Sequence, residues 1–427
     1  MASVDGRSER SWADRGSSRI LSAAALLAAA LAVLAVVATS GGHQTTTSAV
    51  THGSPGGSPG SNSGGTPAGT TTTVAGGTTT TGSTTASSTN TTSSAPSSLS
   101  LAHALGQMIV TGFAGKVPSA NLLARIREGE IGGVILFSAN TAGGDQGTIT
   151  LIDELQSAAI QGNQPGLLVM TDQEGGEVKR LPGPPDYSAA QMTSASLAGQ
   201  QGHLTGQYLR QIGVNVDLAP VSDVNRTTKG FLATEQRTFG DTATQVALRA
   251  CAFADGLASA GVAPTLKHFP GLGLAVTSTD TAPVMINASA AAIRGDDLVY
   301  RECGQQRTTP ALVMVSSAIY PTVTGGDLPA VLSPEIYNTE LPKIDHLYVV
   351  TISDDLGAGA LLNIPSPAAH AIDAGLDLLL YASDGNVSDY SYHVLLGEAE
   401  HGQLSQSKIQ AAAAAILQLK RGLHLAT

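Results

Sequence analysis

Residues 263–273 read APTLKHFPGLG, a short apolar run that ends in a Lys-His pair and a Pro-Gly turn. Such a nearly continuous apolar run is typical of a strand that is buried on both faces of a parallel sheet. The same kind of run recurs along the chain, bounded each time by turn residues. The eight predicted strands are QMIVTGF (107–113), GGVILF (132–137), LLVMTDQ (167–173), VNVDLAP (214–220), APTLKHF (263–269), ALVMVSS (311–317), LYVVTISDD (347–355) and LDLLLY (376–381).

Segments with helical spacing separate these strands, among them 121–130, 243–261 and 290–303. Eight strands that alternate with helices predict an α/β fold, a (β/α)8 TIM-type barrel over residues 99–427, with a last helix near 404–423 packing outside. An open doubly wound sheet is the alternative. It usually carries a Gly-rich phosphate loop after its first strand, and TGFAGKVPS does not match GxGxxG.

The first part of the chain differs from the barrel in composition. Residues 1–19 are polar and carry four arginines, and residues 20–39 form an uncharged run of mostly Ala, Leu and Val. About twenty residues at about 1.5 Å each reach across a hydrocarbon core of about 30 Å. We therefore predict a transmembrane signal anchor, with 1–19 in the cytoplasm and the barrel outside the cell membrane. A cleaved signal peptide, which would leave the protein secreted, and a helix buried in a soluble domain are the alternatives.

Residues 40–98 consist of Thr, Ser, Gly and Pro with almost no aliphatic side chain. Such a stretch cannot bury enough apolar surface to offset its chain entropy, so it predicts a disordered linker. A repeat-structured stalk is the alternative.

The balance of charges and the cysteines limit the partners and the compartment. A formal net charge of −11 argues against a nucleic-acid partner, which needs a basic face. Cys251 and Cys303 are the only cysteines, and both follow the predicted membrane segment, where oxidation is possible. We consider a disulfide between them and two small buried thiols as alternatives.

Polar residues follow several predicted strands at the point where each strand ends. They are Asp172, Gln173 and Glu174 after the third strand, Lys267 and His268 in the fifth, Ser316 and Ser317 in the sixth, and Ser353, Asp354 and Asp355 in the seventh. The carboxyl ends of all barrel strands open on one face, where active sites lie. Carboxylates with Lys, Arg and His, and without metal-ligand spacing, point to a polyhydroxylated ligand, with no metal or cofactor.

Two of these strand-end features have plainer interpretations. Asp355 is predicted to be the N-cap of the next helix. Lys267 and His268 could be a solvated pair. Their apolar context instead predicts partial burial, with anionic or hydroxyl partners.

Five motifs in order resemble glycoside hydrolase family 3, in particular its single-domain NagZ-like β-N-acetylhexosaminidase branch. They are DQEGGEVKRL (172–181), GVNVDLAPVSDVN (213–225), QRTFGD (236–241), KHFPGLG (267–273) and TISDDL (351–356). The resemblance covers essentially everything after the linker. It implies a retaining exo-β-N-acetylglucosaminidase that removes terminal β-linked N-acetylglucosamine from cell-wall-derived or related glycans, without a cofactor.

The resemblance also implies residue roles. Asp354 matches the nucleophile that forms the glycosyl-enzyme intermediate. The matching substrate-binding residues are Asp172, Arg180, Arg237, Lys267 and His268. A broader β-glucosidase of the family is disfavoured, because those enzymes usually draw their acid/base from a further C-terminal domain.

The sequence departs from the family pattern after KHFPG. The branch continues with a His-Gly-Asp run and then an Asp-Ser-His that supplies the general acid/base. Here Leu272 and Leu274 replace His and Asp, and residues 278–280 read Ser-Thr-Asp.

Three explanations of this departure compete. Asp280 has taken over as the acid/base, for which it needs an apolar or anionic setting. Alternatively, another loop supplies the acid, through Glu235 or Asp241. The third possibility is a membrane-tethered barrel that binds glycan with impaired or no catalysis.

Overall fold

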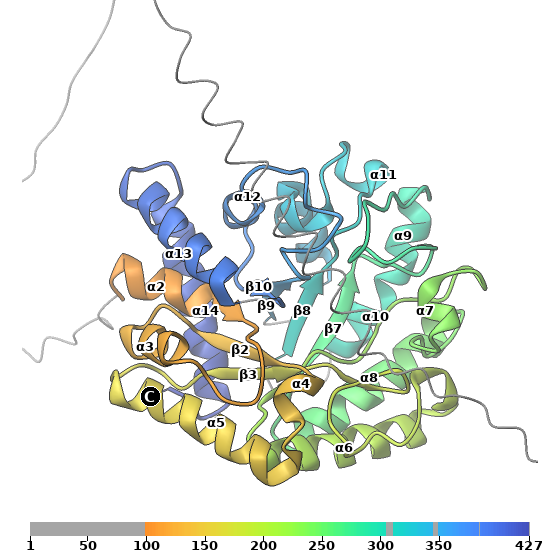
Figure 1. Cartoon of the computed structure of the whole chain (residues 1–427). Coiled ribbons are helices and arrows are strands. Elements are labelled where there is room, and N and C mark those ends of the chain that lie inside the picture. The colour runs from red at the N-terminus through yellow and green to blue at the C-terminus, as the bar shows by residue number, and fades with distance from the viewer. Residues whose placement is uncertain (1–98, 305–310, 345–348, 384, 427) are drawn as a thin grey trace, which may run out of the picture. The chain divides into compact units, whose positions relative to one another are not determined.

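The computed structural model describes residues 99–304, 311–344, 349–383 and 385–426 (Figure 1). The predicted cytoplasmic segment, membrane segment and linker, residues 1–98, lie outside these described residues. Within the described ranges, none of the helices combines the length and the apolar character needed to cross a membrane.

Eight parallel strands form the centre of the described fold, one inside each predicted run. They are β1 (Ile109–Thr111), β2 (Gly133–Leu136), β3 (Leu168–Thr171), β6 (Val216–Asp217), β7 (Ala263–Phe269), β8 (Ala311–Val315), β9 (Val349–Ser353) and β10 (Leu379–Tyr381). Their order in the sheet is β10-β1-β2-β3-β6-β7-β8-β9. A parallel bridge between Ile352 and Leu378 joins the two ends. The prediction of a closed barrel is confirmed, and the open doubly wound alternative is wrong.

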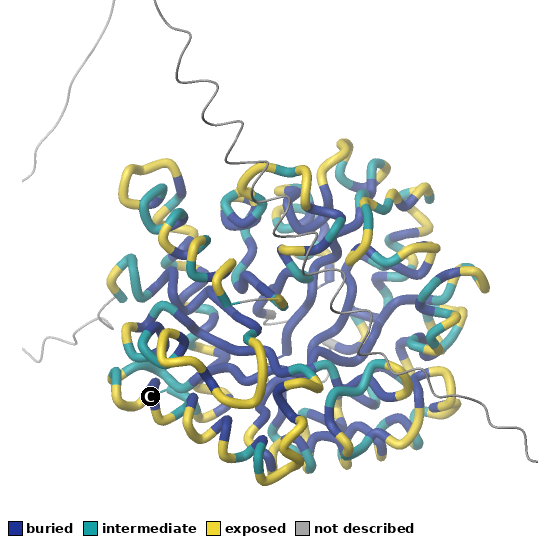
Figure 2. The backbone as a smooth tube through the Cα atoms, viewed as in Figure 1, coloured by how far each residue is buried: buried dark blue, intermediate teal, exposed yellow. Residues whose placement is uncertain are grey.

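The register of the strands explains why each reads as an apolar run. Neighbouring strands pair in parallel, as Val134 does with Val169 and Leu266 with Val313. Strand residues that point inward pack in the barrel, and those that point outward pack under helices, so both kinds are buried. Figure 2 shows this buried centre in dark blue, with the exposed residues on the surrounding helices and loops.

Helices surround the strands (Figure 1). They are α2 (Leu101–Met108), α3 (Ala120–Glu128), α4 (Ser138–Thr141), α5 (Gly144–Gln161), α6 (Ala195–Ile212), α7 (Phe231–Thr234), α8 (Ala243–Ser259), α9 (Ala290–Asp296), α10 (Leu298–Gly304), α11 (Pro321–Thr324), α12 (Pro367–Ala374), α13 (Gly385–Glu400) and α14 (Gln406–Gly422). Short 3₁₀ turns lie at Ala189–Gln191, Ala330–Leu332 and Leu341–Lys343, and a π turn lies at Ile336–Glu340.

Local sequence signals begin and end several of these helices. The hydroxyls of Ser119, Ser194 and Thr242 accept hydrogen bonds from the first turns of α3, α6 and α8, as N-caps do. Gly129 and Gly213 end α3 and α6 in the left-handed conformation that glycine tolerates best. The predicted last helix is α14, which packs against α2.

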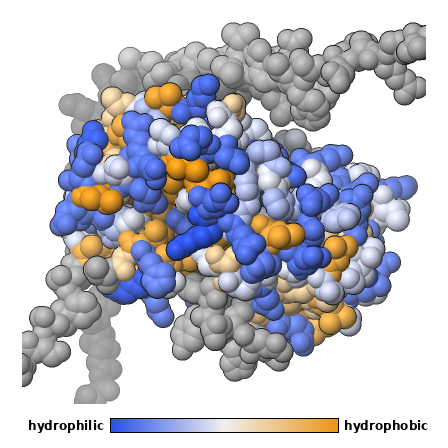
Figure 3. All heavy atoms as spheres, turned by 90° about the horizontal axis from the view of Figure 1, so that it is seen from below, coloured by the Kyte–Doolittle hydropathy of each residue, from blue (hydrophilic) through white to orange (hydrophobic). Residues whose placement is uncertain are grey.

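Helices α6 and α8 pack closely, and α8 is linked to α10. A Cβ on Gly202 of α6 would lie 2.1 Å from the carbonyl oxygen of Phe253 on α8, so only glycine allows this approach. Cys251 of α8 forms a disulfide with Cys303 of α10. On the face that Figure 3 shows, hydrophobic residues lie in separate patches among hydrophilic ones.

Candidate active site

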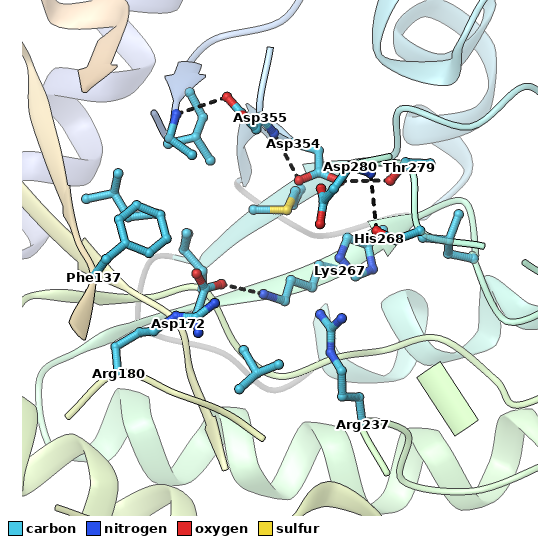
Figure 4. Close-up of a pocket in the computed structure, with 18 of the residues that line it drawn as sticks. Phe137, Asp172, Arg180, Arg237, Lys267, His268, Thr279, Asp280, Asp354 and Asp355 are labelled. Atoms are coloured by element: carbon cyan, nitrogen blue, oxygen red, sulfur yellow. Dashed lines mark hydrogen bonds and ion pairs between the residues drawn. The ribbon is translucent and has the colours of Figure 1, made fainter. Parts of the chain in front are cut away.

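A cavity of about 290 Å³ lies at the carboxyl ends of the strands. Its lining includes all five residues predicted to bind substrate, together with Asp354 and Asp280. Figure 4 shows these side chains converging from strand β7 and from loops that are far apart in the sequence. Glu235 and Asp241, the other candidates for the acid, are not among its lining residues.

Lys267 lies at the centre of an ion-pair network on the cavity wall. Its Nζ is 2.7 Å from Asp172 Oδ1 and 2.7 Å from Glu174 Oε1, and its side chain is 3% exposed. Burial lowers the pKa of Lys267, but the charges of Asp172 and Glu174 outweigh this effect, so the pKa is raised. His268 is buried as well. The interpretation of Lys267 and His268 as a solvated pair is therefore wrong, because both side chains find anionic partners inside the barrel.

Glu174 joins Lys267 to Arg237. Arg237 donates from Nε to Glu174 Oε2 at 2.8 Å and from Nη2 to Oε1 at 2.9 Å. Burial raises the pKa of Glu174, but the charges of Arg237 and Lys267 lower it to about 2. The sequence placed Glu174 at a strand end but gave it no function, although its place in DQEGG, next to Asp172, was the available signal.

A short hairpin that the sequence did not predict positions Arg180. It consists of β4 (Gln173–Gly175) and β5 (Val178–Lys179). The buried Gln173 side chain donates to Leu181 O at 3.0 Å and accepts from the backbone N of Arg180 at 3.1 Å. The guanidinium of Arg180 lies 5.6 Å from the ring centroid of Phe137.

Asp217, at the end of β6, forms a hydrogen bond with the first residue of this hairpin. Its Oδ1 accepts from the backbone N of Gln173 at 2.9 Å. Its Oδ2 has no hydrogen-bond partner. Burial raises the pKa of Asp217 to about 8, so this carboxyl is mostly protonated at neutral pH.

Asp223 orients His268. The sequence did not predict this role for Asp223. Asp223 Oδ2 is 2.7 Å from His268 Nδ1 and 3.2 Å from its backbone N. Asp223 Oδ1 accepts from Leu272 N at 2.5 Å. This pairing leaves Nε2 of His268 as the ring nitrogen available to a ligand, because Nδ1 is engaged.

Asp354 lies directly after β9, with its carboxylate at the cavity. Its Oδ1 accepts from the backbone N of Asp355 at 2.9 Å, and Thr279 Oγ1 lies 3.5 Å from its Oδ2. Burial raises the pKa of Asp354 to about 6, since it outweighs the opposing charges of His268 and Lys267, and Asp280 adds to the increase. The Lys267 and His268 charges therefore favour ionised Asp354 without returning its pKa to the ordinary range.

Asp355 is not a helix N-cap, so that prediction is wrong. Its Oδ1 accepts from the backbone N of Gly357 and of Ala382, each at 3.0 Å. The next helix, α12, begins at Pro367 after Ser366. A loop separates Asp355 from that helix, and the carboxylate ties this loop to the end of β10.

Asp280 extends from the loop after β7 into the cavity beside Asp354 (Figure 4). Its side chain is exposed. Glu235, in contrast, does not line the cavity. Its Oε2 lies 3.4 Å from Nη1 of Arg237.

Outside the cavity, Glu130, Asp389 and His393 form the one cluster in the described ranges with metal-like ligand spacing. Nε of Arg125 lies 3.0 Å from Oε2 of Glu130 and 3.4 Å from Oδ1 of Asp389. Its guanidinium already supplies a cation to these carboxylates, so we assign them no metal.

These features define a class of protein. A closed barrel has a cavity at its catalytic face, where two neighbouring carboxylates face a wall of Lys, Arg and His donors. Paired carboxylates with donors for hydroxyl groups are the machinery of glycoside hydrolases.

Comparison with known proteins agrees with this class. The chain belongs to glycosyl hydrolase family 3: the family's N-terminal domain matches residues 100–419. It is therefore a glycoside hydrolase, similar to β-hexosaminidases.

Two relatives in sequence span most of the barrel. An uncharacterized secreted glycosyl hydrolase of Arthroderma benhamiae is 32% identical over 325 residues, which cover 73% of this chain and 91% of the relative. A β-hexosaminidase of Xylella fastidiosa is 31% identical over 296 residues, which cover 66% of this chain and 85% of the relative.

Two solved structures are similar as well. The β-N-acetylglucosaminidase of glycoside hydrolase family 3 from Paenibacillus has a TM-score of 0.72 and 28% identity, covering 77% of this chain and 63% of its own. The β-N-acetylhexosaminidase from Beutenbergia cavernae has a TM-score of 0.68 and 29% identity, covering 76% of this chain and 99% of its own.

Proposed function

We propose that the protein is a retaining exo-β-N-acetylglucosaminidase that forms a glycosyl-enzyme intermediate on Asp354. The observation that carries the proposal is the placement of Asp354 and Asp280 side by side in one cavity. The names of the Xylella, Paenibacillus and Beutenbergia relatives favour an N-acetylated sugar. The substrate is a terminal β-linked N-acetylglucosamine on cell-wall-derived or related glycans.

The wall of the cavity binds the sugar hydroxyls. Asp172 offers carboxylate oxygens as acceptors, and Lys267 donates from the same ion pair. Arg180, Arg237 and His268 complete the polar lining. Directional hydrogen bonds of this kind orient the ring and discriminate against sugars that lack the hydroxyl.

Asp280 acts as the general acid/base in this mechanism. The ionised Asp354 attacks the anomeric carbon, while Asp280 gives its proton to the glycosidic oxygen and the C–O bond to the leaving group breaks. Asp280 then takes a proton from water, whose oxygen attacks the anomeric carbon and releases Asp354. The sugar keeps its anomeric configuration after the two displacements.

We place this activity outside the cytoplasm. The apolar segment 20–39 and the polar linker that follows it favour export, with the segment either retained as a single-pass anchor or cleaved. The secreted relative from Arthroderma favours export as well.

The second candidate function is a membrane-tethered barrel that binds glycan without efficient catalysis. The observation that favours it is the absence of the family's Asp-Ser-His acid/base motif, because residues 278–280 read Ser-Thr-Asp. Leu272 and Leu274 also replace the His and Asp of the preceding His-Gly-Asp run, and an aliphatic side chain has no proton to donate.

One experiment separates the two candidates. The purified full chain is incubated with an aryl β-N-acetylglucosaminide and an aryl β-glucoside, with Asp354→Ala as the control. Release from the N-acetylated substrate alone, lost in Asp354→Ala, is the expected result. Equal release by Asp354→Ala would remove the nucleophile assignment. No release by the folded wild-type protein, with retained glycan binding, would establish the second candidate.

A further inference from the structure

The loop that bears Asp280 and the loop that follows Asp354 are joined by backbone hydrogen bonds. Gly359 N donates to Asp280 O at 2.9 Å, and Ala360 N donates to Thr279 O at 3.0 Å. The side chain of Thr279 makes a third link, because its Oγ1 lies 3.5 Å from Asp354 Oδ2. The two carboxylates of the reaction therefore lie on segments that contact each other directly.

The loop after Asp354 is itself attached to the barrel. Asp355 Oδ1 accepts from Gly357 N and from Ala382 N at the end of β10. Leu356 N donates to Leu380 O of β10 at 2.9 Å. The loop that contains Gly359 is thus attached to the end of β10, which lies next to β9, the strand that Asp354 follows.

Glycine is required where the two loops touch. A Cβ on Gly359 would lie 2.4 Å from both the carbonyl carbon and the oxygen of Thr281, and 2.9 Å from Asp280 O. Atoms at 2.4 Å overlap, and backbone atoms cannot turn away as a side chain can. Any side chain at position 359 must therefore displace the two loops relative to each other, and with them the backbone that carries Asp280.

We propose that Gly359 is a positioning residue, which sets the distance of Asp280 from Asp354 through this backbone contact. The inference rests on the proposed acid/base role of Asp280. A retaining glycosidase needs its two carboxyl groups about 5–5.5 Å apart, so that one attacks the anomeric carbon while the other reaches the glycosidic oxygen. Because Gly359 and Ala360 hold the loop, the proton donor is already in place when the substrate enters.

The test compares Gly359→Ala with Gly357→Ala in the full chain. Gly357 lies in the same loop, but a Cβ there would lie 3.4 Å from Asp355 Oδ1, an ordinary contact. Two β-N-acetylglucosaminides are used, one with an alkyl leaving group and one with a dinitrophenyl group that leaves without protonation. Asp280→Asn is measured in parallel, and thermal unfolding is followed for all variants.

In Gly359→Ala we expect kcat/KM to fall about 10²-fold on the alkyl substrate and to change less than about threefold on the dinitrophenyl substrate. On the dinitrophenyl substrate kcat should fall, because the displaced Asp280 no longer takes a proton from the water that attacks the glycosyl-enzyme intermediate. Azide should restore kcat, since it attacks the anomeric carbon without giving up a proton and yields the β-glycosyl azide. Gly357→Ala should stay within about twofold of the wild type on both substrates.

An equal loss on both substrates, or no effect of azide, would overturn the positioning role of Gly359. If Asp280→Asn shows the leaving-group dependence and Gly359→Ala does not, this inference fails while the proposed function stands. If Asp280→Asn lacks that dependence, the acid assignment fails and this inference with it. Should Gly359→Ala not fold, Ala360→Pro removes the donor to Thr279 O without a Cβ at 359, and must show the same pattern.

Discussion

Glu174 lies between Lys267, which is buried, and Arg237, whose side chain is 13% exposed, and it contacts both. It accepts two hydrogen bonds from Arg237 and lies 2.7 Å from Lys267 Nζ. Removing one partner of such a buried pair leaves uncompensated charge, which is far more costly than the pair itself is stabilising. The residue therefore links stability to the arrangement of two cations that line the cavity.

Glu174→Gln should lower both stability and activity. We expect the free energy of unfolding to fall by about 3 kcal/mol, and kcat/KM to fall because Arg237 and Lys267 lose the carboxylate that positions them. Glu340→Gln is the matched control, since Glu340 is buried, pairs with Arg294 and Lys343 and does not line the cavity. Denaturant unfolding should show a smaller loss for Glu340→Gln, because the side chains of Arg294 and Lys343 are 42% and 45% exposed and stay solvated. Its kcat/KM should be unchanged. Normal kcat/KM in Glu174→Gln would contradict the positioning role.

The raised pKa of Asp354 has a direct kinetic consequence. Only the ionised carboxylate can attack the anomeric carbon, so kcat/KM should fall as the pH drops below about 6. Burial is the main cause of this high pKa, and the charge of Asp280 adds to it. In Asp280→Asn that charge is gone, so the acidic limb should move to lower pH. The pH profile of kcat/KM on the activated aryl substrate measures the acidic limb of the wild type and its shift in Asp280→Asn. An acidic limb near pH 4 in the wild type would refute the assignment of Asp354 as the nucleophile.

At the scale of one helix, α14 contains a lysine that no mechanism uses. Lys420 is fully buried, and its Nζ donates to Gln107 Oε1 of α2 at 2.6 Å. Burial lowers the pKa of Lys420 to about 7. In the unfolded chain its pKa is about 10.4, so between these values the unfolded state binds more protons and stability rises with pH.

Lys420→Met should therefore stabilise the barrel, and more so at low pH. We expect the free energy of unfolding to rise by roughly 2–4 kcal/mol at pH 6 and by less at pH 9. Lys116→Met, on an exposed loop, removes one positive charge without touching a helix. Urea unfolding at the two pH values gives the comparison. A loss of stability at pH 6 would show that the contact with Gln107 matters more than the buried charge.

At the scale of the whole barrel, the disulfide joins helices on neighbouring repeats. Cys251 and Cys303 are 52 residues apart in the sequence, and β7 and α9 lie between them. Closing a loop of this length removes conformations from the unfolded chain, which is worth about 4 kcal/mol in the chain-entropy model.

Cys251→Ala/Cys303→Ala should lower the free energy of unfolding by roughly 3–4 kcal/mol and leave kcat/KM unchanged, because neither cysteine lines the cavity. Reductant should destabilise the wild type by a similar amount and have no effect on the double variant. Equal stability of the wild type with and without reductant would mean that the bond does not contribute.

Much of the fold could be predicted because barrel strands are buried on both faces and leave a signal in the local sequence. All eight strands lie within the predicted runs, and α14 lies within the predicted last helix. The helical segment 290–303 forms two helices, α9 and α10, since periodicity alone does not reveal a break. The β4–β5 hairpin was missed because it is held by one side chain, Gln173, and by no repeating pattern.

The sequence could predict which residues gather at the candidate site, but not which of them form ion pairs and hydrogen bonds with each other. The rule that strand ends meet on one face brought Asp172, Lys267, His268 and Asp354 to one place. Their partners depend on distances between residues far apart in the chain, as in the contact of Lys267 with Asp172, 95 positions away. The predicted N-cap role of Asp355 is wrong for the same reason, since its hydrogen-bond partner Ala382 lies at the end of another strand, β10.

Residue types and their order were thus enough to specify a parallel barrel with basic and carboxylate side chains gathered at the carboxyl ends of its strands. That information is local, because burial imposes an apolar pattern on each strand wherever it lies. The tertiary structure decided which charges compensate each other, how high the pKa of Asp354 rises, and which acidic loop reaches the cavity. These properties depend on contacts of about 3 Å and on exclusion of water, both of which exist only once the strands have closed into a barrel.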